Sequence, residues 1–287
     1  MNTSFSITHL DKTFGVIVEG LKLTDLNNSQ TDELYKLWIE HHLLIFPNQH
    51  LSQEEQIKFA KLFGEMEFDI TPISNVRKDG SIRDPVNDDI VKSLRGNMEW
   101  HHDSTYMPIQ AKGSVFTAHQ VPAKGGETGW ADMTSAYEAL DQDMKTKIED
   151  LSAYHSYTYS QAKYKHKPQG ESEFSGYGFD VDPPPFRPLV KTHPETGKKS
   201  LLIGRHAYGI PGMSKEESKS LLDELNNFAC QQGDRVYHHS WKVGDAVIWD
   251  NRNLMHQACT WDLTEARVMY HSRIQGEPAT ESGLNYL

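Results

Sequence analysis

Short segments of apolar or alternating apolar and polar residues, bounded by glycine and proline, recur along the chain. This pattern is typical of β-strands, in which successive side chains face opposite sides. The clearest examples are residues 14–19, 113–121, 200–203, 245–249 and 267–274. The pattern therefore predicts a mainly β protein.

Three other segments carry apolar residues at helical spacing. In two of them a serine is followed three residues later by glutamate, a capping box that marks the start of a helix. One predicted helix runs from Ser52 to Gly64, and another begins at Ser214 and carries the stripe Leu221, Leu222, Leu225 and Phe228. The third covers residues 31–44, with the stripe Leu34, Leu37, Trp38 and Leu44. Such stripes usually pack against a core, so we expect helices that flank the sheets.

Two long segments, residues 75–96 and 163–188, are rich in charge, glycine or proline and predict loops. Loops of this length in a compact domain are usually active-site lids or disordered. Neither is expected to link two domains, because the candidate site described below draws residues from both sides of the second one. We therefore expect a single domain over residues 1–287, with the identity of the lid left open.

Composition narrows the class of protein. The chain has 287 residues, of which 37% are hydrophobic and 24% charged, as in ordinary globular proteins. Its net charge of −11 argues against nucleic acid as a partner and leaves a small-molecule substrate open. The two cysteines provide no disulfide framework, and no apolar run approaches the ~20 residues of a membrane helix. We expect a cytoplasmic protein without a membrane partner, and a homo-oligomer is left open.

The residues His101, His102 and Asp103 predict a metal site. In a strand, His101 and Asp103 point to the same face, while His102 points away. A second histidine, His256, follows a predicted strand and polar turn over residues 244–252. Two histidines and one carboxylate form the facial triad that holds Fe(II) and leaves coordination positions open for a co-substrate and oxygen.

An arginine in the strand that follows predicts a co-substrate. Arg267 stands eleven residues beyond His256. A dicarboxylate that chelates iron through its keto-acid end needs a cation at its far carboxylate, which arginine can bind with two parallel hydrogen bonds. Thr128, after Gly125 and Gly126, can add a hydroxyl to the same carboxylate.

The order of these motifs resembles a known family. Trp-His-x-Asp at 100–103, Gly-Gly-x-Thr at 125–128, Trp-Asp-Asn-Arg-x-x-x-His at 249–256 and the arginine at 267 resemble the taurine dioxygenase and dichlorophenoxyacetate dioxygenase family. Its members are oxygenases that depend on Fe(II) and 2-oxoglutarate. Five further segments are similar to the (S)-selective phenoxypropionate, or aryloxyalkanoate, dioxygenases within it: residues 73–76, 96–98, 100–108, 200–210 and 270–274.

The resemblance implies a fold, a site and a reaction. The fold is a double-stranded β-helix, or jelly roll, with helices outside. His101, Asp103 and His256 are the implied iron ligands, Thr128 and Arg267 hold 2-oxoglutarate, and Trp249 lines that pocket. With O₂ as the second co-substrate, the implied reaction hydroxylates a carboxylate-bearing ether. An aryloxyalkanoate would then split into a phenol and a 2-oxo acid.

The substrate contacts are where this chain departs from the family pattern. Taurine-type members have an arginine four residues after the co-substrate arginine, but this chain has His271 there. His271 or Arg273 can supply the replacement cation, and Arg273 is the weaker candidate because it lies ~20 Å along the strand from Arg267 at ~3.3 Å per residue. Asn97 matches a substrate-contacting family position, and Met98 and Tyr106 are candidate apolar lining.

Three alternatives remain from the sequence. The same enzyme class can act on taurine, alkyl sulfonates or sulfate esters. A non-catalytic β-barrel can bind a metal structurally, although such sites normally have four protein ligands. A zinc hydrolase would need a general base at the metal and would leave the predicted anion site of Arg267 and Thr128 unexplained.

Overall fold

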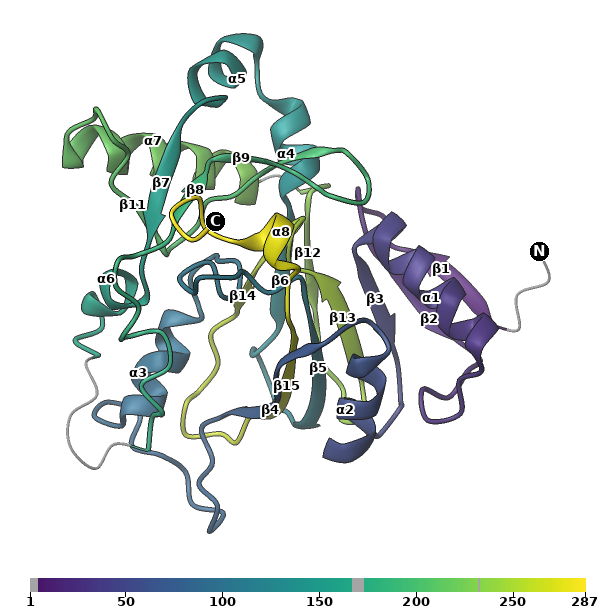
Figure 1. Ribbon diagram of the computed structural model, residues 1–287. Helices are drawn as coiled ribbons and strands as arrows, with labels where there is room; N and C mark the ends of the chain where they lie inside the picture. The colour runs from purple at the N-terminus through teal and green to yellow at the C-terminus, as the bar shows by residue number, and fades with distance from the viewer. Residues whose placement is uncertain (1–4, 167–172, 232) are drawn as a thin grey trace.

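Two β-sheets lie at the centre of the computed structural model, which describes residues 5–166, 173–231 and 233–287 (Figure 1). The larger sheet has the strand order β1-β2-β3-β13-β5-β15-β4. In that order the strands span Ser6–His9, Val16–Glu19, Leu43–Phe46, Ala246–Asp250, Gly113–Gln120, Val268–Ile274 and Met66–Ser74. The smaller sheet has the order β12-β6-β14, with strands Val236–His239, Thr128–Asp132 and Leu254–Ala258. Neighbouring strands in both sheets are antiparallel, except β2 and β3.

Alternate side chains of the two sheets meet in one apolar core. Ile45 and Trp249 of the larger sheet pack in the same cluster as Trp130 and Leu254 of the smaller sheet. Because successive residues of a strand face opposite sides, Ile248 points out of this core and into a second cluster. Two sheets that face each other across a shared core form a jelly roll, which confirms the predicted fold.

Helices cover the outer face of each sheet. The helices span Asn28–His41 (α1), Gln53–Lys61 (α2), Asp89–Gly96 (α3), Met133–Ala139 (α4), Gln142–Ile148 (α5), Tyr157–Ala162 (α6), Lys215–Cys230 (α7) and Pro278–Glu281 (α8). Trp38 of α1 and Phe59 of α2 pack on the larger sheet. Met133 of α4 and Leu225 of α7 pack behind the smaller one (Figure 1). Among the described residues, no helix is both long enough and apolar enough to cross a membrane.

Two small sheets lie between β6 and β12 along the chain. One has the order β11-β7-β8, with strands Ala207–Tyr208, Ser152–His155 and Phe186–Pro188. The other pairs β10 with β9, which span Lys199–Leu201 and Val190–Thr192. Arg205 N donates to Trp100 O at 2.9 Å, which places the segment before β11 against the start of the Trp-His-x-Asp motif. This part of the chain therefore forms one side of the candidate site.

The structure confirms the predicted strands and both serine capping boxes, and it corrects several boundaries. Ser52 and Ser214 cap α2 and α7, but α2 ends at Lys61 rather than at Gly64. The helix predicted over residues 31–44 corresponds to α1, which begins at Asn28 and ends at His41. Asn27 supplies a capping box of the Asn-x-x-Gln type, and His42 ends α1 in the left-handed region with φ 64°. Leu44 therefore belongs to β3, although it packs in the same core as α1.

The predictions of two long loops are partly wrong. The segment 75–96 contains α3, a helix capped by Asp88 whose buried side includes Val91 and Leu94. This helix was not predicted because its apolar side is short and it contains several charged residues and a final glycine. The segment 163–188 ends in β8 rather than in a loop. Residues 167–172 of that predicted loop lie outside the described residues.

A buried ion pair at the turn between β13 and β14 is expected to stabilise the folded protein. Asp250 accepts hydrogen bonds from Arg252 at 2.8 Å, pairs with His193 at 3.0 Å, and is fully buried. We expect Asp250→Asn to lower the free energy of unfolding by about 3 kcal/mol, because it leaves the buried Arg252 without its nearest counter-charge. Urea denaturation at pH 7 measures this loss, and an unchanged midpoint would contradict it.

The same ion pair should make the stability of the protein depend on pH. Burial opposes the charge of Asp250, but Arg252 and His193 hold the pKa of that carboxyl far below its ordinary value. A depressed pKa in the folded state stabilises the protein above the unfolded-state pKa, about 4, and this contribution disappears as the pH falls below that value. Between pH 5 and pH 3 the wild type should therefore lose more stability than Asp250→Asn. An equal loss in both proteins would contradict this.

Candidate metal and co-substrate site

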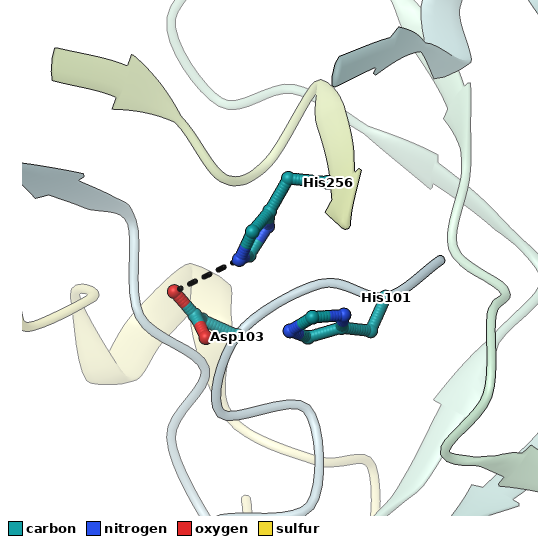
Figure 2. Close-up of side chains that lie close together, drawn as sticks. All are labelled: His101, Asp103 and His256. Carbon is teal, nitrogen blue, oxygen red and sulfur yellow. Dashed lines mark ion pairs between the residues drawn. The ribbon is translucent and has the colours of Figure 1, made fainter. Parts of the chain in front are cut away.

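Two backbone hydrogen bonds bring the predicted ligands together. His101 N donates to His256 O at 3.0 Å and His256 N donates to His101 O at 2.8 Å, which forms an isolated antiparallel bridge. Asp103, two residues on, turns its carboxylate toward the imidazole of His256 (Figure 2). One ligand atom from each of the three residues lies within 4.8 Å of the others. His102 turns away, and its Nδ1 lies 2.7 Å from the carbonyl of Asn251, as strand alternation predicts.

Both histidines are neutral and have a ring nitrogen to offer. Nδ1 of His101 lies 2.7 Å from the carbonyl of Glu99, which fixes the proton on that nitrogen and leaves Nε2 free. Burial lowers the pKa of His101 well below its ordinary value, and a neighbouring His256 adds to that effect. Burial likewise lowers the pKa of His256 to about 4. Neutral imidazoles are the form that binds a metal ion.

Asp103 is held as a carboxylate. Its Oδ1 accepts a hydrogen bond from Arg273 at 2.9 Å and its Oδ2 accepts one from Ser114 at 3.1 Å. Burial opposes ionisation, but Arg273, His256 and His271 hold the pKa of Asp103 well below its ordinary value. The group is therefore negative at neutral pH and lies between two neutral imidazoles.

This donor set fits Fe(II). Two imidazole nitrogens and one carboxylate oxygen, all buried, match the facial arrangement of non-haem iron oxygenases. Across residues 5–166, 173–231 and 233–287, no fourth histidine, cysteine or acidic side chain joins this cluster. A structural zinc site would normally have a fourth protein ligand. The arrangement therefore leaves coordination positions for a co-substrate and for oxygen.

The three ligands open into a cavity of about 390 Å³. Aromatic rings and two arginines dominate its wall, together with a few small polar side chains. The wall comprises Glu67, Phe68, Thr71, Ile73, Ser93, Asn97, His101, Asp103, Tyr106, Phe116, Thr128, Tyr157, Phe174, Ser175, Tyr177, His206, His256, Ala258, Arg267, His271 and Arg273. The cavity therefore combines an apolar surface with two permanent positive charges.

Arg267 and Thr128 form a candidate anion site in this cavity. Arg267 is 1% exposed, and its Nε donates to the carbonyl of Gly126 at 3.0 Å. No carboxylate of the described residues lies within ion-pair distance of its guanidinium, and burial lowers the pKa of Arg267 to about 10. A buried cation without a counter-charge is costly, so the site favours an anionic ligand.

The hydroxyl of Thr128 is oriented for the same ligand. Its Oγ accepts a hydrogen bond from the indole of Trp241 at 2.9 Å and lies 3.5 Å from Nη2 of Arg267. Since the hydroxyl oxygen already accepts hydrogen bonds, its own proton is available to donate. The position of Trp241 was not predicted, because a tryptophan in a loop gives no local sequence signal for such a contact.

The other predicted residues divide into those that line the cavity and those that do not. Asn97, Tyr106, His271 and Arg273 line it. Met98 is outside the cavity wall. Trp249 is also outside the wall and is fully buried, with its ring stacked near His271 at 5.8 Å and tilted against His256 at 4.8 Å. Its direct contact with a co-substrate stays a prediction, and the structure places it behind two cavity-lining rings.

His271 and Arg273 differ in charge. Burial lowers the pKa of His271, which leaves this ring neutral at pH 7. Burial also opposes the charge of Arg273, but Asp103, Tyr106 and Glu67 raise its pKa above the ordinary value. Arg273 rather than His271 is therefore the second permanent cation in the wall, and which of the two contacts the substrate stays a prediction.

A segment of the predicted loop 163–188 covers the cavity. Phe174 and Tyr177 line it, and the hydroxyl of Tyr177 donates to Glu67. Glu173 forms ion pairs with two arginines of the other predicted loop, Arg77 and, at 2.7 Å, Arg83. The aromatic residues of this cover were not predicted, because the loop pattern shows length and polarity but not which side chains face inward.

The chain is similar to known proteins over nearly its whole length. The sequence profile of the family described as taurine catabolism dioxygenase TauD, TfdA family matches residues 6–273. The chain is 56% identical to the (S)-phenoxypropionate/alpha-ketoglutarate-dioxygenase of Sphingobium herbicidovorans, over 99% of each chain. It is 50% identical to the enzyme of the same name from Delftia acidovorans, over 98% of each. A crystal structure of AAD-2 in complex with Mn(II) and N-oxalylglycine matches with a TM-score of 0.88 and 35% identity, over 98% of this chain and 99% of that one.

Proposed function

Because the chain belongs to the TauD/TfdA family of dioxygenases, we propose that it hydroxylates an aryloxyalkanoate, a small carboxylate-bearing aryl ether. It is a 2-oxoglutarate-dependent dioxygenase that uses Fe(II) and O₂. Hydroxylation at the carbon that bears the ether oxygen gives a hemiketal or hemiacetal. This product releases a phenol and leaves a 2-oxo acid, or an aldehyde acid from an acetate side chain.

The observation that carries the proposal is a pair of buried arginines, one directly before β15 and one within it. Arg267 and Arg273 are the two permanently charged cations in the cavity wall, among the residues that the structure describes. Arg267 directly precedes β15 and Arg273 lies six residues further on within it, about 20 Å for an extended chain at ~3.3 Å per residue, and both side chains line the cavity. Two anions can therefore bind separately, the distal carboxylate of 2-oxoglutarate at Arg267 and the substrate carboxylate at Arg273.

Each group of residues then has a distinct task. His101, Asp103 and His256 hold the ion, which when bound activates oxygen and couples decarboxylation of 2-oxoglutarate to oxidation of a substrate C–H bond. Arg267 and Thr128 orient 2-oxoglutarate. The aromatic wall packs against the aryl ring of the substrate and excludes water, as in most small-molecule sites.

A panel of acids tests the substrate class. Full-length protein with Fe(II) and 2-oxoglutarate should release succinate with aryloxypropionates and aryloxyacetates, and much less with taurine or alkyl sulfates. The reason is that position 271 carries a neutral histidine where taurine-type enzymes have an arginine. Strong turnover with taurine or an alkyl sulfate alone would contradict the proposed substrate and leave the reaction class intact.

Arg273 gives a second test, through KM. Arg273→Lys keeps a positive charge but loses the planar fork that grips a carboxylate. We expect the KM for phenoxypropionate to rise about 10- to 100-fold, the equivalent of one charge-assisted hydrogen bond. The KM for 2-oxoglutarate should rise less, because Arg267 is intact, even though Arg273 also donates to the proposed metal ligand Asp103. An unchanged KM for phenoxypropionate, or an equal rise in both KM values, would contradict this role.

A further inference from the structure

The side chain of Asn251 holds the peptide of Asp103 from both sides. Asp103 N donates to Oδ1 of Asn251 at 2.8 Å, and Nδ2 of Asn251 donates back to Asp103 O at 2.9 Å. The second hydrogen of Nδ2 goes to the carbonyl of Ala111 at 2.8 Å. Asn251 is 0% exposed, so water cannot replace these contacts without entering the core. One buried amide therefore pairs with both the N–H and the C=O of a proposed metal ligand.

This pairing continues the strand pairing that stops at His101. The bridge between His101 and His256 fixes these two ligands relative to each other, and beyond it no strand of the described part of the chain pairs with Asp103. The amide of Asn251 offers a donor and an acceptor side by side, as a neighbouring strand would. In addition, the backbone carbonyl of Asn251 lies 2.7 Å from Nδ1 of His102.

We infer that Asn251 is a positioning residue for the metal site. It fixes the peptide of Asp103 so that the carboxylate stays aligned with His101 and His256. The side-chain contacts with Arg273 and Ser114 set the rotation of the carboxylate, but they cannot hold the backbone that carries it. This inference rests on the proposed ligand set and adds to it a residue that touches neither metal nor substrate.

A neighbouring asparagine provides a matched control. Asn253 lies in the same turn and is also 0% exposed. Its amide pairs with Thr134 at 2.9 Å and with His42 at 2.9 Å, and neither hydrogen bond involves the segment of His101 and Asp103. Replacing either asparagine by alanine removes buried hydrogen bonds from one turn. A purely structural role for Asn251 therefore predicts the same consequences for both variants.

The affinity for Mn(II) distinguishes a positioning role of Asn251 from a purely structural one. The full-length wild type, Asn251→Ala, Asn253→Ala and His101→Ala are titrated with Mn(II) and followed by electron paramagnetic resonance. Thermal unfolding of each protein without metal is recorded beside it. We expect both asparagine variants to unfold at lower temperature. Asn251→Ala alone should bind Mn(II) about 10- to 100-fold more weakly, the usual effect of a change just outside the ligands.

The outcomes decide between the proposals. If the wild type binds Mn(II) no better than His101→Ala, the proposed ligand set itself is wrong. If the wild type binds tightly and Asn251→Ala binds equally well, or Asn253→Ala weakens as much, the positioning role is wrong. Where Asn251→Ala does not fold, Asn251→Asp decides in the same way. It keeps the shape and one acceptor, but it places a carboxylate oxygen against the carbonyls of Asp103 and Ala111.

Discussion

Replacing Asp103 by alanine is expected to abolish oxygen-dependent turnover. The variant removes the single anionic ligand of the proposed triad and leaves Arg273 as a buried cation without its nearest partner. Metal affinity should fall by more than the roughly 10- to 100-fold typical of changes outside the ligand shell. Succinate formation, with and without an aryloxypropionate, measures the loss, and Mn(II) titration identifies its cause.

The control for this variant is another buried aspartate. Asp132 is 4% exposed and caps α4, but it is not part of the cavity wall. Asp132→Ala should destabilise the protein, because it removes a helix cap, and should keep its Mn(II) affinity. Turnover by Asp103→Ala at the wild-type rate would overturn the ligand assignment. Equal loss of Mn(II) affinity in both variants would mean that general destabilisation explains the effect.

Arg267→Met is expected to weaken 2-oxoglutarate binding about 100-fold or more. Its guanidinium can form two charge-assisted hydrogen bonds to the distal carboxylate, each worth about 1.5–3 kcal/mol. The variant should keep its Mn(II) affinity, because Arg267 is not a proposed ligand and its hydrogen bonds go to Asn75, Gly126 and Thr128. Isothermal titration of the Mn(II)-loaded protein with 2-oxoglutarate measures the change.

Arg267→Lys refines this prediction. Lysine keeps the charge and loses the planar fork, so its affinity for 2-oxoglutarate should lie between those of the wild type and Arg267→Met. The KM for the aryloxypropionate should stay near the wild-type value at saturating 2-oxoglutarate. An unchanged affinity in Arg267→Met would show that the co-substrate carboxylate binds elsewhere in the cavity.

Much of the candidate site could be predicted because it depends on strand alternation. His101 and Asp103 were expected on one face and His102 on the other, and Arg267, His271 and Arg273 were expected to share a face of one strand. The structure places His101, Asp103, Arg267, His271 and Arg273 in the cavity wall and turns His102 away, although only His101, as a single bridge, and the two residues of β15 are paired as strand. Alternation of apolar and polar residues also predicts the strands, and the local capping boxes of Ser52 and Ser214 predict where α2 and α7 begin.

Contacts between distant segments could not be predicted. The bond from Trp241 to Thr128 and the clamp of Asn251 on Asp103 each join residues more than 100 positions apart. Asn251 belongs to the Trp-Asp-Asn-Arg-x-x-x-His motif, but the motif does not show which distant residue its side chain contacts. The charge states of His271 and Arg273 could not be predicted for a similar reason. Whether His271 or Arg273 is the cation depends on burial and on Asp103, which only the fold reveals. A single domain over residues 1–287 and a homo-oligomer stay predictions.

The most direct test is product stoichiometry with one substrate. Full-length protein, Fe(II), 2-oxoglutarate and (S)-2-phenoxypropionate are incubated in air, and phenol, pyruvate and succinate are quantified. Ether cleavage through hydroxylation predicts equal amounts of all three, with no phenol when iron, 2-oxoglutarate or oxygen is left out. Succinate without phenol, or phenol formed without 2-oxoglutarate, would contradict the proposed function.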